Sequence, residues 1–153
     1  MRYIYLHGFA SGPRSRKAQA FRTALELSGA ELETPDLASD GFEHLTITGQ
    51  LKVLGHTLAL SPARLIGSSM GGYLAALYAA THPEVDRLVL LAPAFQFPAR
   101  WSEVAGPDDM RTWRDSGWLE VYHYATEEMR RVHYGCMKTR SGTIPIPNFS
   151  SPR

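Results

Sequence analysis

The chain has 153 residues, of which 44% are hydrophobic and 20% are charged, and its formal net charge is +1. This length allows one domain with a single core, and this composition is typical of a soluble globular protein. A charge so close to zero argues against nucleic acid or an anionic membrane surface as a partner.

The remaining composition points to an ordinary intracellular protein. Cys136 is the only cysteine, so no internal disulfide can form. No apolar run is long enough for a signal peptide or a membrane span, and we therefore expect a cytoplasmic location. The sequence predicts no oligomeric state.

Apolar periodicity, interrupted by glycine and proline, predicts strands that alternate with helices. The expected elements, in chain order, are a strand at 2–6, a helix at 15–29, a weak strand at 31–34, a helix at 43–60, a strand at 64–66, a helix at 73–80 and a strand at 87–93. The last strand, RLVLLAP, is the most continuous, which is typical of a parallel strand covered on both faces. The alternation indicates a three-layer α/β fold with a parallel sheet.

In such a sheet the active crevice lies at the carboxyl ends of the strands. Two strand ends are unusual in this chain: HGF at 7–9 and GSSMGG at 67–72. We expect these two segments to lie side by side.

Aromatic residues gather among charges from about 95 to 134, and GPDD and DSG interrupt this segment. The pattern predicts a helical insertion that covers the crevice as a lid. An ordinary aromatic packing layer is the alternative, and composition does not separate the two.

Ser69 stands between Gly67 and Gly71 in a G-x-S-x-G pattern. Between a strand and a helix this pattern is the nucleophile elbow, a sharp turn that pushes the serine hydroxyl into the crevice. The glycines let the strand and the helix pass close together. A glycine-rich turn without chemical meaning is the alternative, which the flanking strand, the following helix and the loop at 7–9 disfavour. The chain has neither a GK[ST] phosphate loop nor a G-x-G-x-x-G dinucleotide motif.

An acyl-transfer site also needs two backbone N–H groups aimed at the developing oxyanion, each worth about 3 kcal/mol. Met70, next to the nucleophile, supplies one candidate amide, and Phe9, in the loop after the first strand, supplies the other. His7 precedes Gly8 in that loop. A role in holding the loop by hydrogen bonds is favoured for His7 over a role as the base.

Several stretches carry a resemblance to a known family: YLHGFASGPRSRKAQAF, TPDL, FEHLTITGQL, GSSMGGYLAALYA, WLEVYHYA and HYG. Over about residues 1–135 the chain resembles the bacterial α/β-hydrolase family of YqiA/YcfP-type esterases. The resemblance implies serine hydrolysis of small-molecule carboxylic esters or thioesters, without metal or cofactor. It implies Ser69 as the nucleophile and Phe9 and Met70 as the oxyanion donors.

The resemblance ends near Gly135. Members of the family continue into two strands whose loops bring the catalytic aspartate and histidine, whereas this chain continues as CMKTRSGTIPIPNFSSPR. This stretch contains no Asp, Glu, His or apolar strand. We expect residues 136–153 to form an irregular tail and the chain to lack its catalytic acid and base. If the codons that can encode this tail are translated in a reading frame shifted by two nucleotides, one permitted translation is an acidic helix end followed by an apolar strand. This suggests that the tail is translated out of frame.

The upstream histidines do not supply a convincing base. His44, His56 and His82 are expected at the surface or near helix ends. His123 and His133 lie in the aromatic insertion and could approach the crevice, but a role as base is disfavoured for both. Among the acids, Asp36 and Asp40 follow the second strand, away from the usual position of the catalytic acid.

A serine without its general base keeps a residual rate of about 10³ to 10⁴ over water. We therefore expect the polypeptide to be nearly inactive, and also poorly stable because the strand at 87–93 is left as an uncovered edge. A non-catalytic α/β-hydrolase-like protein that binds a small molecule is the alternative function. A haloperoxidase-like or transferase activity at the same elbow also stays open.

Overall fold

The computed structural model describes residues 1–137, apart from the side chains at positions 98, 99 and 104. The tail that the sequence predicts over 136–153 therefore lies outside the described residues from position 138 onward. Its first two residues, Cys136 and Met137, are buried in a short 3-10 turn at Tyr134–Met137.

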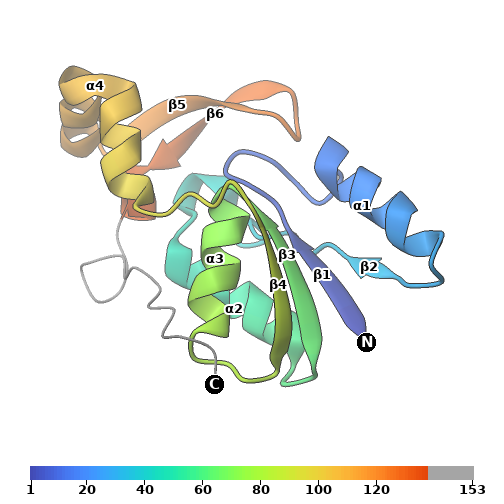
Figure 1. Ribbon diagram of the computed structural model, residues 1–153. Helices are drawn as coiled ribbons and strands as arrows, with labels where there is room; N and C mark the ends of the chain where they lie inside the picture. The colour runs from blue at the N-terminus through green and yellow to red at the C-terminus, as the bar shows by residue number, and fades with distance from the viewer. Residues whose placement is uncertain (138–153) are drawn as a thin grey trace.

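Within the described residues, a parallel sheet is connected by helices (Figure 1). The strands are β1 (Arg2–Leu6), β2 (Leu32–Glu33), β3 (Ala63–Ser68) and β4 (Val85–Leu91), in the spatial order β2-β1-β3-β4. The helices are α1 (Arg16–Glu26), α2 (Ile47–Leu58) and α3 (Met70–Ala79). Because every pairing in this sheet is parallel, the carboxyl ends of β1, β3 and β4 meet at one edge.

The sheet separates two apolar cores, as the alternation of side chains along β1 requires. Ile4 and Leu6 pack into the larger core, together with residues of α2 and α3. Tyr5 points the other way and packs with Ala18 of α1. Figure 1 shows α1 on one side of the sheet and α2 and α3 on the other. The predicted three-layer α/β fold is confirmed.

Two helices begin three or four residues away from their predicted starts, and the helix predicted to end at position 29 ends at Glu26. The helix expected from position 43 begins at Ile47, because Thr46 caps it by accepting a hydrogen bond from the Gly49 N–H (3.0 Å). The residues before the cap, Phe42–His44, form a 3-10 turn. The helix expected from position 73 begins at Met70, directly after Ser69.

The insertion after β4 is helical only in its first half. Helix α4 (Phe97–Ser116) is kinked at Gly106 and ends at Gly117, where φ is +80°. An antiparallel hairpin follows, formed by β5 (Trp118–His123) and β6 (Glu128–His133). The expectation of an entirely helical insertion is therefore wrong over the hairpin. Neither α4 nor any other described helix has the length and apolarity needed to cross a bilayer.

Strand β4 is the edge of the sheet in the described part of the chain, where it pairs with β3 alone. Leu88 and Leu90 pack against the larger core, but Val89 on the opposite face is 45% exposed. The expectation that both faces of this strand are covered is therefore wrong within the described residues. The expected uncovered edge is present there, and such an edge favours association with other chains.

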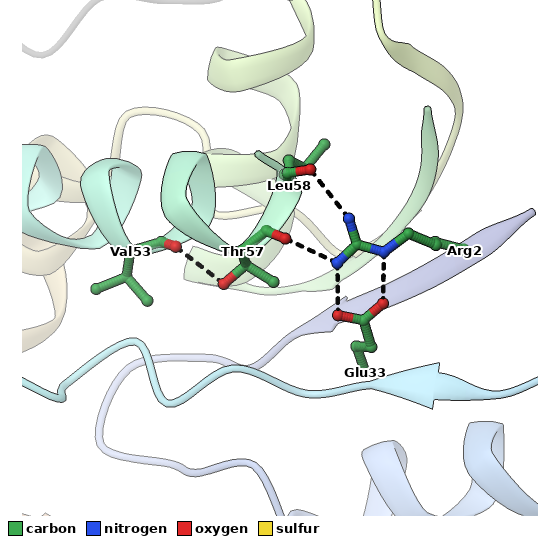
Figure 2. A network of polar contacts seen from close by, with 5 residues as sticks. All are labelled: Arg2, Glu33, Val53, Thr57 and Leu58. Atoms are coloured by element: carbon green, nitrogen blue, oxygen red, sulfur yellow. Dashed lines mark hydrogen bonds and ion pairs between the residues drawn. The ribbon is translucent and has the colours of Figure 1, made fainter. Parts of the chain in front are cut away.

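Arg2 joins three elements at the end of the sheet that carries the strand N-termini (Figure 2). Its guanidinium donates two hydrogen bonds of 2.7 Å to the Glu33 carboxylate on β2. It also donates to the Leu58 carbonyl (3.0 Å) and to the Thr57 carbonyl (2.7 Å) at the end of α2. Neither carbonyl has a partner within the helix. The Leu58 carbonyl also accepts from the Ser61 N–H (2.9 Å), and the cation binds both carbonyls and complements the helix dipole.

Replacing Arg2 by alanine is expected to lower the free energy of unfolding by about 1 kcal/mol at pH 7, a modest value because the ion pair is partly exposed. The hydrogen bonds from Arg2 hold the pKa of Glu33 below its ordinary value. The ion pair therefore contributes fully to the free energy of unfolding when the pH is above the ordinary pKa of Glu33. This contribution is lost as the pH falls through the lowered pKa.

Urea titrations of both proteins at pH 7 and pH 3 measure the effect, with the exposed residue Lys52 changed to alanine as the control. The difference between wild type and Arg2→Ala should be smaller at pH 3, because part of the contribution of the ion pair is lost once the pH falls below the ordinary pKa of Glu33. An equal difference at both pH values would contradict the assignment to the ion pair.

Candidate active site

Ser69 occupies a sharp corner between β3 and α3. Its backbone has φ 52° and ψ −119°, and such strained conformations cost on the order of 1–3 kcal/mol. The end of β4 and the chain after it hold the corner: the Ser69 N–H donates to the Leu91 carbonyl (3.0 Å), and the Ser69 carbonyl accepts from the Ala94 N–H (3.0 Å). Ser69 is exposed, whereas Ser68 and Met70 on either side of it are buried. The corner thus presents a single hydroxyl at its tip.

The glycines around Ser69 lie where no side chain fits. A Cβ on Gly67 would lie 2.6 Å from the Gly72 Cα, inside the first turn of α3. A Cβ on Gly71 would lie 2.5 Å from the carbonyl carbon of Leu6 and 2.6 Å from the carbonyl oxygen of His7. These are backbone atoms, which cannot move without disturbing β1. Close approach of the strand and the helix therefore requires both glycines.

The loop after β1 lies directly beside the corner, as the sequence predicts. A Cβ on Gly8 would lie 3.4 Å from the Ser69 Cβ and 3.9 Å from the Ser69 Oγ, which is ordinary contact. The next residue, Phe9, packs its ring against Phe97 and Trp101 of α4, with ring centroids 5.8 Å and 5.2 Å away. The loop is therefore fixed between the serine corner and the insertion.

His7 uses both ring nitrogens within its own surroundings. Its Nε2 accepts a hydrogen bond from the Leu37 N–H (3.2 Å), so Nδ1 carries the proton and donates to the Gly8 carbonyl (3.0 Å). Burial lowers the pKa of His7, although the hydrogen bond to Gly8 and the Asp36 carboxylate 3.9 Å away oppose that shift. A neutral ring bonded in this way holds the loop and has no nitrogen left for Ser69.

The two residues predicted to supply oxyanion donors, Phe9 and Met70, both adjoin the serine corner. Met70 is the first residue of α3, and the N–H groups of a helix's first turn have no partner within the helix and favour an anion. Phe9 follows Gly8, which is in contact with Ser69. An acyl-transfer site needs two such donors near its nucleophile.

Two cavities meet at Ser69. The larger, about 1390 Å³, extends along the loop after β1 and the start of α1 to the turn of the hairpin. The smaller, about 520 Å³, is mainly apolar and lies under α4 and β5. The smaller cavity is lined by Phe9, Ala10, Ser69, Ala94, Phe97, Arg100, Trp101, Val121, Tyr122 and Tyr124.

The insertion contributes both to a packing layer and to the lining of the cavities. Trp113 is fully buried, and its indole N–H donates to the Val132 carbonyl (3.0 Å), so it belongs to a packing layer. Trp101 and Tyr124 instead line the cavities beside Ser69. The Tyr124 N–H donates to the Ala10 carbonyl (2.8 Å), which fastens the hairpin over the loop, as Figure 1 also shows.

Four of the candidate histidines lie away from the serine. His44 and His133 both pack against Trp118, and their own ring centroids lie 5.9 Å apart. His82 stacks on Tyr78 with ring centroids 3.6 Å apart, and its Nδ1 bonds to the Tyr78 carbonyl near the end of α3. His56 is exposed on α2. None of these four residues lines either cavity.

His123 is the histidine that shares the larger cavity with Ser69. It is buried, its Nδ1 lies 2.9 Å from the Thr126 Oγ1, and its ring packs against Phe42. Burial, together with the charge of Arg130, lowers its pKa. No hydrogen bond joins its ring to Ser69 within residues 1–137. Of the two acids considered, Asp36 lines the same cavity, whereas Asp40 is exposed and does not line it.

The chain matches known proteins in sequence. The profile of an uncharacterised protein family, UPF0227, matches residues 2–143. The AB hydrolase superfamily protein YisY of Bacillus subtilis is 43% identical over an alignment of 103 residues, and the match covers 60% of this chain and 38% of YisY.

Solved structures show the same fold. A hydrolase candidate from Agrobacterium vitis S4 superposes with a TM-score of 0.69 at 24% identity, over 89% of this chain and 58% of that one. Mouse alpha/beta hydrolase domain-containing protein 10 superposes with a TM-score of 0.68 at 22% identity, over 88% of this chain and 58% of the mouse protein. Est1E of Butyrivibrio proteoclasticus, solved with ferulic acid bound, superposes with a TM-score of 0.66 at 21% identity, over 86% of this chain and 56% of Est1E. The chain thus has the α/β-hydrolase fold and spans less than two thirds of the length of each of these proteins.

Proposed function

Because the chain belongs to the UPF0227 family and has the α/β-hydrolase fold, we propose that it is a serine hydrolase of carboxylic esters or thioesters. The observation that carries the proposal is the strained corner at Ser69, which holds an exposed hydroxyl beside Gly8 where two cavities meet. Strain of this kind is concentrated at functional sites. Ferulic acid bound to Est1E is a carboxylic acid, the class of product that this reaction would release.

In the proposed reaction the Ser69 Oγ attacks the carbonyl carbon of the substrate. The amides of Phe9 and Met70 donate hydrogen bonds to the oxyanion that forms. The C–O or C–S bond then breaks, the alcohol or thiol leaves with a proton, and the acyl group stays on Ser69. Water releases the acid and restores the serine. The reaction as proposed uses no metal or cofactor and takes place in the cytoplasm.

Removal of the Ser69 proton needs a base, and no histidine among the described residues is hydrogen-bonded to Ser69. His7 has both nitrogens engaged, and His123 has no hydrogen bond to Ser69 within residues 1–137. We therefore propose that this chain lacks the catalytic histidine and aspartate of its family and that the serine reacts slowly.

A fluorophosphonate probe followed by mass spectrometry tests the proposed nucleophile. We expect slow modification at Ser69 that disappears in Ser69→Ala. The matched control is Ser61→Ala, which removes the hydroxyl of a serine that lines neither cavity. Modification of other serines with none at Ser69 would contradict the proposal.

A non-catalytic binding protein is the second candidate function. The mainly apolar cavity of about 520 Å³ at Ser69 favours it, because such a cavity can hold a small molecule without any reaction. The same probe separates the two functions, since an inert serine is not modified. A protein that leaves Ser69 unmodified but binds apolar ligands in this cavity would support the binding function.

A further inference from the structure

The loop between β1 and α1 and the first turn of α1 together present three cations to the larger cavity. Arg14, Arg16 and Lys17 all line it, together with Ser69. The backbone that carries them is held in place: the Ser15 Oγ accepts from the Ala18 N–H (3.3 Å) at the start of α1. Because the turn itself is fixed, the cations remain on the side of the cavity next to the serine.

Within residues 1–137 these three cations make no ion pair, unlike other cations of the chain. Arg130 lines the same cavity, but it is paired with Glu43 at 2.6 Å. The carboxylates that line the cavity are Asp36 and Glu127, so the cations outnumber the carboxylates there. The cavity therefore has an excess of positive charge that a ligand can complement.

The two cavities differ in chemistry on either side of Ser69. The smaller one is formed mostly by aromatic and aliphatic side chains, which suits an apolar acyl group. The larger one holds the unpaired cations. Ser69 and Phe9 line both cavities, so a substrate whose scissile bond lies at Ser69 would extend into each of them.

We infer that the substrate has an apolar acyl group and a leaving group that carries an oxyanion, either phosphate or carboxylate, bound by Arg14, Arg16 and Lys17. This inference rests on the proposed function, because it places the scissile bond at Ser69. Cations bind such oxyanions through charge-assisted hydrogen bonds, and guanidinium groups match them in geometry.

The test measures binding in the full chain with Ser69→Ala, so that no ester is consumed. The probes are 4-butanoyloxy-3-nitrobenzoate, which is an anion, and its neutral methyl ester, each titrated by calorimetry at about 20 mM salt. We expect the anion to bind at least about tenfold more tightly, with most of the difference lost at 0.5 M salt. An ester with a phosphate monoester in place of the carboxylate shows which oxyanion is preferred.

Adding Arg14→Ala and Lys17→Ala should weaken binding of the anion about tenfold and leave the methyl ester within about twofold. The matched control, Lys52→Ala with Arg87→Ala, removes two exposed cations that line neither cavity. Equal affinity for the anion and the methyl ester would overturn the inference, as would an equal loss in both pairs of variants. Because the readout is binding, the affinity for the oxyanion is tested separately from the labelling of Ser69, which tests the proposed function.

Discussion

Replacing Gly71 by alanine is expected to destabilise the chain by at least about 3 kcal/mol, enough to leave much of it unfolded. The new Cβ would lie 2.5 Å from the carbonyl carbon of Leu6 and 2.6 Å from the carbonyl oxygen of His7. Relief would require β1 to move away from α3, and β1 pairs with both β2 and β3. Circular dichroism during thermal and urea unfolding measures the effect.

Gly55→Ala is the matched control for Gly71→Ala. Gly55 lies inside α2, and its added Cβ would come no closer than 3.7 Å to the Tyr78 hydroxyl oxygen. Because alanine is the better helix former by about 1 kcal/mol, this variant should be as stable as the wild type or more stable. A Gly71→Ala protein with wild-type stability would contradict the close approach of β1 and α3.

Local signals in the sequence are enough to predict the serine corner. Gly67 and Gly71 are unfavourable in a regular strand and helix, so their spacing around Ser69 indicates a tight strand–turn–helix. The structure contains that turn, with φ 52° at Ser69. The layered sheet is likewise predictable, because its strands and helices alternate along the chain and each has its own apolar period.

Contacts between distant segments could not be predicted. Residues 118–123 and 128–133 are rich in aromatic and charged side chains, a composition that favours a helical interpretation, although they pair as a hairpin. That hairpin is fixed by the bond from Tyr124 to Ala10 and by the ion pair of Arg130 with Glu43, and neither pairing has a sequence signal. The closely spaced cations Arg14, Arg16 and Lys17 can be recognised from the composition of their segment, but their position at the cavity depends on these contacts.

The 153-residue polypeptide is expected to hydrolyse p-nitrophenyl acetate only slowly, at about 10³ to 10⁴ times the rate in water, and Ser69→Ala should abolish this rate. If the chain lacks a histidine base, as we propose, the serine reacts through its own ionisation. The logarithm of kcat/KM should therefore rise with a slope near one from pH 6 to pH 9, without a plateau. Stopped-flow or plate assays over this range, with Ser69→Ala as the blank, measure the profile.

His123→Gln separates this expectation from the alternative that His123 is the base. If His123 plays no part in proton transfer, the variant should keep the rising profile and stay within about twofold of the wild type at each pH. If it is the base, the wild-type profile must have its midpoint below pH 6.5 and then reach a plateau, because burial lowers the pKa of His123 from that value. The plateau would then vanish in the variant, with a loss of about 10² or more at pH 7. That result would place a working base within residues 1–137 and overturn the proposal that the chain lacks one.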